Sequence, residues 1–274
     1  MIYEAQAAIA VGTAGIAAYI DWKTGLIPNR LTYPAIGLGI VLLALQGSTA
    51  LYGLGVAALV YAMGFLLYKQ GQLGGGDVKL LTGIALLLPY NNSFGIPHVF
   101  NILITASLIM ALTATPYYCF KYLASPRKKE MNKGSLLWGA LLLSLTAAYA
   151  FIMQSSGLFS PLAVGVTVFV MLASAFYSVF GKDLALALFA KPVPLSKVEL
   201  GDVLVVERIT LKQSNSLGLS KGTKVVEEGL LSRAKKLKLK SLWIYSGLPR
   251  FGPALLAGTI VVVFYPDWVS LALS

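Results

Sequence analysis

Long apolar stretches dominate this chain and restrict the folds that are open to it. Hydrophobic residues make up 57% of the 274 residues and charged residues only 12%, which is more apolar surface than one water-soluble core can hide. A helix needs about 20 mostly apolar residues to cross a bilayer, or about 17 where the bilayer is thin. We therefore predict an all-α polytopic membrane protein with about eight transmembrane helices. The predicted spans are residues 3–21, 31–46, 51–68, 77–90, 99–122, 135–153, 161–180 and 251–271.

Basic residues follow one side of this predicted topology. With about eight spans, all 22 Lys and Arg fall in connections on the same side of the membrane, and the other side carries none. Because cytoplasmic loops are enriched in Lys and Arg, we expect these loops to face the cytoplasm, with both termini outside. The net charge of +11 then favours contact with membrane lipids over nucleic acid, which would need a basic face on a soluble domain.

A polar segment interrupts the apolar pattern before the last span. Residues 203–211 have the β-branched character of a strand, residues 223–239 carry apolar side chains at helical spacing, and residues 242–245 are predicted as a second strand. This pattern predicts a small α+β cytoplasmic insertion. The predicted division of the chain is a membrane-embedded catalytic bundle at 1–190, the insertion at 191–250, and a final transmembrane helix packing on the bundle at 251–274.

Only two acidic residues, Asp21 and Asp77, lie between Ala5 and Lys129. Each stands where an apolar stretch meets a short polar loop. A carboxylate at bilayer depth costs about 2.5–3.5 kcal/mol, so an acid retained there indicates a functional site. Two carboxyls close together in a low-dielectric site are expected to share a proton, so that one activates a water molecule and the other donates a proton. This chemistry needs no metal or cofactor, and we expect none.

The loop after Asp21 contains signals for the start of the next helix. Pro28 biases the preceding residue away from helix, and Asn29 or Thr32 is predicted to cap the helix that follows. We expect Pro28 and Asn29 to support the site by fixing where Asp21 lies.

Three glycines, Gly74, Gly75 and Gly76, precede a helix that is predicted to begin at Asp77. Glycine permits positive φ and allows another backbone to come close, so this unwound segment is expected to admit a substrate backbone next to Asp77. The alternative is that the glycines end one helix and fit between its neighbours. Lys79 points about 160° away from Asp77 on a helix and is expected to be a lipid-facing anchor.

The two loops together resemble a known family. Asp21 followed by Ile-Pro-Asn-x-Leu-Thr, and then Gly-x-Gly-Asp-x-Lys-Leu-Leu opening a later helix, is similar to the type IV prepilin peptidases, the archaeal preflagellin and prepilin peptidases in particular. Residues 1–88 carry this resemblance well. A final helix that opens with Gly-Leu-Pro-x-Phe, at residues 247–251, is reminiscent of the archaeal members.

The resemblance implies an intramembrane aspartic endopeptidase with Asp21 and Asp77 as its catalytic pair. Its substrates would be prepilin-like or preflagellin-like precursors, which lose a short leader peptide at the cytoplasmic membrane face. The cysteine-containing region of many bacterial members is missing, so no methyltransferase activity is expected. The sequence carries no signal for an oligomeric state.

Three other interpretations stay open. Ion- or proton-coupled transporters also use paired membrane acids beside broken helices, although no inverted repeat is evident here. A non-catalytic scaffold could use the two acids for hydrogen bonds between helices. A peptidase of the same family could process a substrate other than a pilin. Transport predicts substrate-dependent ion flux, whereas a peptidase predicts a shortened precursor and no flux.

Overall fold

The structure divides into two compact units. It is a computed structural model, and the units are Met1–Ala106 with Phe189–Phe264, and Ser107–Leu188 with Tyr265–Ser274. The residues described are 2–47, 50–89, 97–126, 131–156, 160–210, 214, 216–219, 224–266 and 268.

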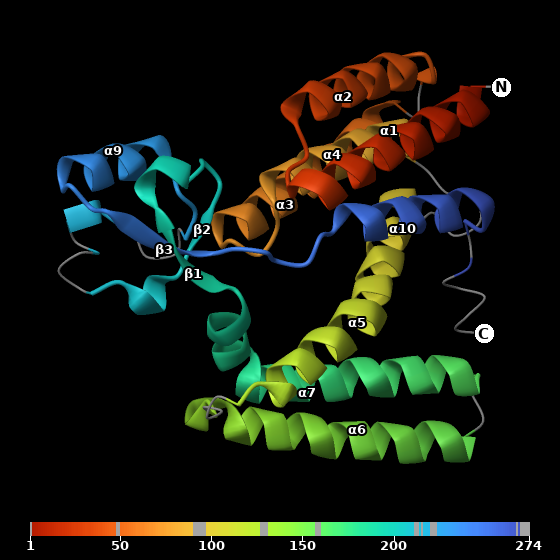
Figure 1. The fold of residues 1–274 in the computed structure, drawn as a ribbon. Coiled ribbons are helices and arrows are strands. Elements are labelled where there is room, and N and C mark those ends of the chain that lie inside the picture. Colours follow the sequence, from red (N-terminus) through yellow and green to blue (C-terminus); the bar gives the residue numbers. More distant parts are fainter. Residues whose placement is uncertain are drawn as a thin grey trace. The chain divides into compact units, whose positions relative to one another are not determined.

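A helix lies at each of the eight predicted spans (Figure 1). These helices are α1 (Ile2–Thr24), α2 (Asn29–Ala44), α3 (Ala50–Lys69), α4 (Gly75–Leu87), α5 (His98–Ala124), α6 (Leu136–Ser156), α7 (Pro161–Leu188) and α10 (Gly252–Phe264). Among the described residues, four helices are long and apolar enough to cross a membrane, namely α3, α5, α6 and α7. The prediction of a mostly helical membrane protein is therefore confirmed, whereas the count of eight spans stays a prediction.

Two of the helices at predicted spans are short. Both α4 and α10 have 13 residues. At 1.5 Å per residue this is about 20 Å, against about 30 Å for the hydrocarbon core of a bilayer. The last helix ends at Phe264, well before the predicted boundary at residue 271, which lies outside the described residues.

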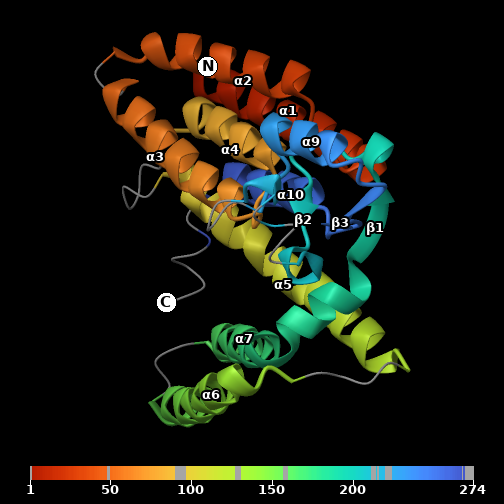
Figure 2. The same ribbon diagram turned by 90° about the vertical axis from the view of Figure 1, so that its left-hand side faces the viewer.

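Helix α4 forms the centre of the first unit and packs against α2 and α3 (Figures 1 and 2). After Lys79 it is almost entirely apolar, as expected for a helix that is surrounded by others, and Val78 and residues 80–87 are all buried. Small residues allow the close contacts. A Cβ atom at Gly39 of α2 would lie only 2.6 Å from Cβ of Leu86, and one at Gly64 of α3 would lie 2.8 Å from Val78 Cγ1.

Helix α10 packs against α1 in the same unit. Small residues lie at this contact, since a Cβ atom at Gly252 of α10 would lie 3.2 Å from Cα of Ala18, and one at Gly15 of α1 would lie 3.9 Å from Leu256 Cδ1. The start of α10 is thereby brought close to Asp21.

The polar insertion is confirmed as an α+β segment, with different boundaries from those predicted. It contains β1 (Ala190–Pro194), β2 (Val203–Leu204), α9 (Glu228–Lys236) and β3 (Ser241–Tyr245), and its antiparallel sheet has the order β1-β3-β2. The predicted strand at 203–211 is wrong beyond Leu204, because Val206–Arg208 forms a 3-10 turn instead. Strand β1 was not predicted.

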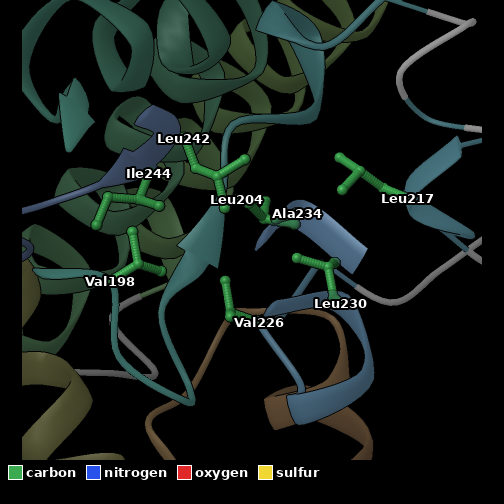
Figure 3. Packing of buried hydrophobic residues seen from close by; sticks show 8 residues of the cluster. All are labelled: Val198, Leu204, Leu217, Val226, Leu230, Ala234, Leu242 and Ile244. Carbon is green, nitrogen blue, oxygen red and sulfur yellow. The ribbon is translucent and has the colours of Figure 1, made fainter. Parts of the chain in front are cut away.

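The insertion has its own small hydrophobic core (Figure 3). Leu242 and Ile244 alternate along β3 and face inward, as the two-residue period of a strand requires. Leu230 and Ala234 of α9 lie one helical turn apart and pack onto the same core. The remaining members of this core are Val198, Leu204, Leu217 and Val226.

The insertion also contacts the loop that joins α3 to α4. Lys69 Nζ lies 3.6 Å from Glu227 Oε1, and the backbone N–H of Lys224 donates a 3.3 Å hydrogen bond to the Lys69 carbonyl. Gly71 has a φ of +71°, and a Cβ atom there would lie 2.7 Å from Val203 Cγ1. The insertion therefore rests on the segment that leads to Asp77.

The second unit contains the later part of α5 together with α6 and α7. Helices α6 and α7 run side by side (Figures 1 and 2). Their apolar side chains are largely exposed, as expected for helices that face lipid. Helix α7 continues past its predicted end at residue 180. The Tyr122 hydroxyl donates a 2.6 Å hydrogen bond to Oδ2 of Asp183 there, and this partner explains how a buried acid is tolerated in the added turns.

Candidate active site

Asp21 lies in the last turn of α1 and is only 6% exposed. The helix ends because Gly25 adopts a left-handed conformation, with a φ of +78°. In this conformation its N–H donates a 2.8 Å hydrogen bond to the main-chain carbonyl of Asp21, which satisfies an acceptor that the helix end leaves open. The loop after α1 thus begins at a fixed point.

The start of α10 supplies the partner of the Asp21 side chain. The backbone N–H of Gly252 donates a 2.9 Å hydrogen bond to Oδ2 of Asp21, and the bond is buried. Only glycine fits at this position, since a Cβ atom would lie 2.9 Å from both Cβ and Oδ2 of Asp21. Two positions earlier, the Arg250 guanidinium donates a hydrogen bond to the main-chain carbonyl of Asp21.

Asp77 lies in the first turn of α4, three residues after the N-cap residue Gly74. Its carboxyl accepts a hydrogen bond from the Gly74 N–H, which is the reciprocal bond of a capping box and satisfies a donor that the helix start leaves open. A Cβ atom at Gly74 would lie 2.6 Å from Oδ2 of Asp77, so glycine at position 74 leaves room for the Asp77 carboxyl to lie over the start of the helix.

The structure corrects the prediction for the three glycines. Helix α4 begins at Gly75 and not at Asp77, and Gly74 has a φ of −70°. None of Gly74, Gly75 and Gly76 has positive φ, so this segment is not unwound in the way the sequence suggested. Gly75 lies against the ring of Tyr68, since a Cβ atom at this glycine would lie 3.2 Å from Cε2 of the ring.

Gly76 permits the close backbone approach that was predicted, but its neighbour belongs to this chain. A Cβ atom at Gly76 would lie 2.8 Å from Cβ and 2.9 Å from the carbonyl oxygen of Ile27. Ile27 lies in the loop that follows Asp21. The contact therefore joins the Asp21 loop to the start of the Asp77 helix.

Ile27 lies outside the helices, as Pro28 predicted, whereas Asn29 makes a contact that was not predicted. Pro28 is the N-cap residue of α2, and its carbonyl accepts a 3.0 Å hydrogen bond from the N–H of Leu31. The predicted side-chain cap by Asn29 or Thr32 is wrong, because no side chain caps α2. Asn29 Oδ1 instead accepts a 2.6 Å hydrogen bond from Lys79 Nζ, and this bond joins the start of α2 to α4.

Helix α1, which carries Asp21, packs against α4, which carries Asp77. The contact of Gly76 with Ile27 joins the same two segments. Two acids that share a partly desolvated site form a coupled pair. Such a pair holds one proton between two carboxyls over part of the pH range, and it can then accept and donate a proton in the same place. Within the described residues, no group of three or more His, Cys, Asp or Glu side chains could hold a metal ion.

Sequence reasoning missed two residues that contact Asp21, namely Arg250 and Gly252. They are separated from Asp21 by 229 and 231 positions, so no local pattern could connect them. The signal that could have found them is the Gly-Leu-Pro-x-Phe segment at residues 247–251, whose variable position is Arg250.

Comparisons with known proteins agree with the resemblance predicted for the N-terminal part. Residues 8–115, which include both aspartates, match the type IV leader peptidase family. Over 86 residues the chain is 42% identical to the prepilin peptidase EppA of Methanothermobacter thermautotrophicus. That alignment covers 28% of this chain and 22% of the relative's length. No solved structure gives a significant match.

Proposed function

We propose, on the premise that residues 8–115 are those of a type IV leader peptidase, that this chain is an aspartic endopeptidase. It removes the leader peptide from prepilin-like or preflagellin-like precursors at the cytoplasmic face of the membrane. The observation that carries the proposal is the contact between the segments that hold Asp21 and Asp77, since α1 packs against α4 and Gly76 lies against Ile27.

The mechanism follows from one shared proton. The ionised carboxyl takes a proton from a water molecule, whose oxygen then attacks the peptide carbonyl carbon, while the protonated carboxyl donates to the carbonyl oxygen. Collapse of the tetrahedral intermediate breaks the C–N bond, and a proton passes to the leaving nitrogen. The Gly252 and Gly74 N–H groups hold the Asp21 and Asp77 carboxyls in place during these transfers.

Side chains beside Asp21 support a position near the inner membrane surface. Trp22 is 69% exposed and Tyr19 is 60% exposed, and amphipathic aromatic rings are enriched where lipid meets water. Lys23 Nζ lies 4.7 Å from the centre of the Tyr19 ring. A basic residue at this level is typical of the cytoplasmic boundary.

Recognition rests on the apolar helix of the precursor and on the backbone around the cut, and not on the basic loops. A cationic surface would repel the basic leaders of such precursors, so the basic loops do not bind them. These loops instead orient the protein and bind anionic lipids. No methyltransferase activity forms part of the proposal.

The test is co-expression with candidate precursors, and it compares the parent with Asp21→Asn and Asp77→Asn. Asparagine keeps the size of the side chain and removes the titratable proton, so each variant should lose cleavage. Asp183→Asn is a matched control, because Asp183 is also buried and its asparagine can still accept the Tyr122 hydrogen bond. Near-normal cleavage by either dyad variant, or substrate-dependent ion flux in liposomes without cleavage, would refute the proposal.

A further inference from the structure

Arg250 makes an unusual contact with the candidate site. Its Nη1 donates a hydrogen bond to the main-chain carbonyl oxygen of Asp21, and this bond is partly buried. The same oxygen accepts the 2.8 Å hydrogen bond of the Gly25 N–H. The guanidinium therefore binds the end of the helix that carries the acid, and within the described residues it forms no ion pair with the Asp21 carboxylate.

The space around this contact is built for the guanidinium. Gly25 has a φ of +78°, and a Cβ atom at this position would lie 2.6 Å from Nη1 and 3.1 Å from Cζ of Arg250. A larger residue at position 25 would be strained and would also displace the arginine. Glycine at position 25 therefore satisfies both the left-handed turn and the space that the Arg250 guanidinium occupies.

The choice of acceptor has a chemical consequence. A guanidinium paired with the carboxylate would favour its ionised form and hinder the sharing of a proton with a second acid. A guanidinium bound to the main-chain carbonyl fixes the position of the residue and leaves the carboxyl free to exchange its proton. The side chain is oriented separately, through the Gly252 N–H to Oδ2.

We propose that Arg250 is a positioning residue for Asp21, which holds the end of α1 at the distance from α4 that the shared proton requires. This inference rests on the proposed peptidase function. It assigns a task to the segment between β3 and α10, since Arg250 and Gly252 together fix the backbone and the side chain of one acid.

The test uses the full chain in detergent or proteoliposomes with a cleavable precursor. Arg250→Gln should lower kcat by about 10- to 100-fold, because a small misplacement of a catalytic group costs this much, and KM should stay within about threefold. Arg250→Lys keeps a charged donor and should recover part of the loss. Arg30→Gln removes a charge from an exposed position in the first turn of α2 and should match the parent.

The pH profile separates positioning from a direct electrostatic role. If Arg250 acts through the carbonyl, kcat falls in Arg250→Gln while both inflections of the profile keep their pH values. A shift of the acidic limb to higher pH would mean that the guanidinium stabilises the carboxylate, and it would overturn the inference. Activity of Arg250→Gln equal to that of Arg30→Gln would overturn it as well.

A double-variant measurement covers the case in which Arg250→Gln does not accumulate as folded protein. Gly25→Ala and Arg250→Lys disturb the same contact, so their combined effect on kcat should be clearly less than the product of the single effects. Independent effects would contradict the inference. Failure of the proposed function is distinguishable from failure of this inference: in the former, the parent does not cleave the precursor, or Asp21→Asn still cleaves it.

Discussion

Lys79 Nζ donates a 2.6 Å hydrogen bond to Oδ1 of Asn29, and this contact connects α4 to the start of α2. The same ammonium lies 5.0 Å from the centre of the Tyr33 ring, also on α2. Lys79 and Asn29 belong to the two sequence motifs on which the family resemblance depends. Some residues of these motifs therefore hold two helices together, whether or not other residues of the motifs act on a substrate.

Replacement of Lys79 by Met tests this structural role. The variant loses an exposed hydrogen bond and a cation–π contact, so the free energy of unfolding should fall by only about 0.5–1 kcal/mol. Cleavage should stay within about threefold of the parent, because Lys79 contacts Asn29 and Tyr33 and not the dyad. Thermal unfolding and precursor cleavage measure the two quantities. A loss of activity as large as that of Asp77→Asn would assign Lys79 a catalytic role instead.

Replacement of Gly76 by Ala tests the contact between the two loops. Its Cβ atom would meet the Ile27 carbonyl at 2.9 Å, and this backbone cannot move aside without moving the Asp21 loop. We expect a loss of about 1–3 kcal/mol in unfolding free energy, typical of overpacking, together with reduced cleavage. Gly55→Ala is the control, since a Cβ atom at position 55 of α3 has no neighbour within 4 Å. Equal behaviour of the two variants in thermal unfolding would contradict the predicted clash.

The insertion should lose stability at alkaline pH through Tyr245. Partial burial and then the negative charge of Glu207 raise the pKa of Tyr245 to about 12, from a usual value of 10.0. Because the folded state binds this proton more tightly, the contribution of Tyr245 is complete below about pH 10 and is lost as the pH rises through about 12. Tyr245→Phe has no hydroxyl to titrate, so its unfolding temperature should decline less over this interval. Parallel declines in the two proteins would show that Tyr245 does not carry the effect.

The sequence was sufficient to find the two acids and the helices around them. Asp21 and Asp77 stand out because an acid is costly beside apolar stretches, and the helix starts at Asn29 and near Asp77 follow from Pro28 and the glycines. The number of spans could not be fixed in this way. Helix α4 is buried among α1, α2 and α3, and a buried helix needs apolar residues on every side just as a membrane span does, so composition alone does not distinguish the two.

Long-range pairing explains what the sequence did not reveal. Strand β1 contains Pro192 and Pro194, which argue against a strand, yet it lies at the edge of the sheet where missing N–H donors are tolerated. Asn29 looked like a helix cap because nothing in the sequence indicates that Lys79, on another helix, binds its side chain. The contacts of Arg250 and Gly252 with Asp21 depend in the same way on the fold.

The hydrogen bond between Gly252 and Asp21 has a consequence for biosynthesis. The two residues are 231 positions apart, so Asp21 has already left the ribosome long before its partner is translated. A nascent polypeptide that still lacks α10 holds both acids without the N–H group that orients the first of them. The candidate site around Asp21 is therefore assembled only after α10 has been made.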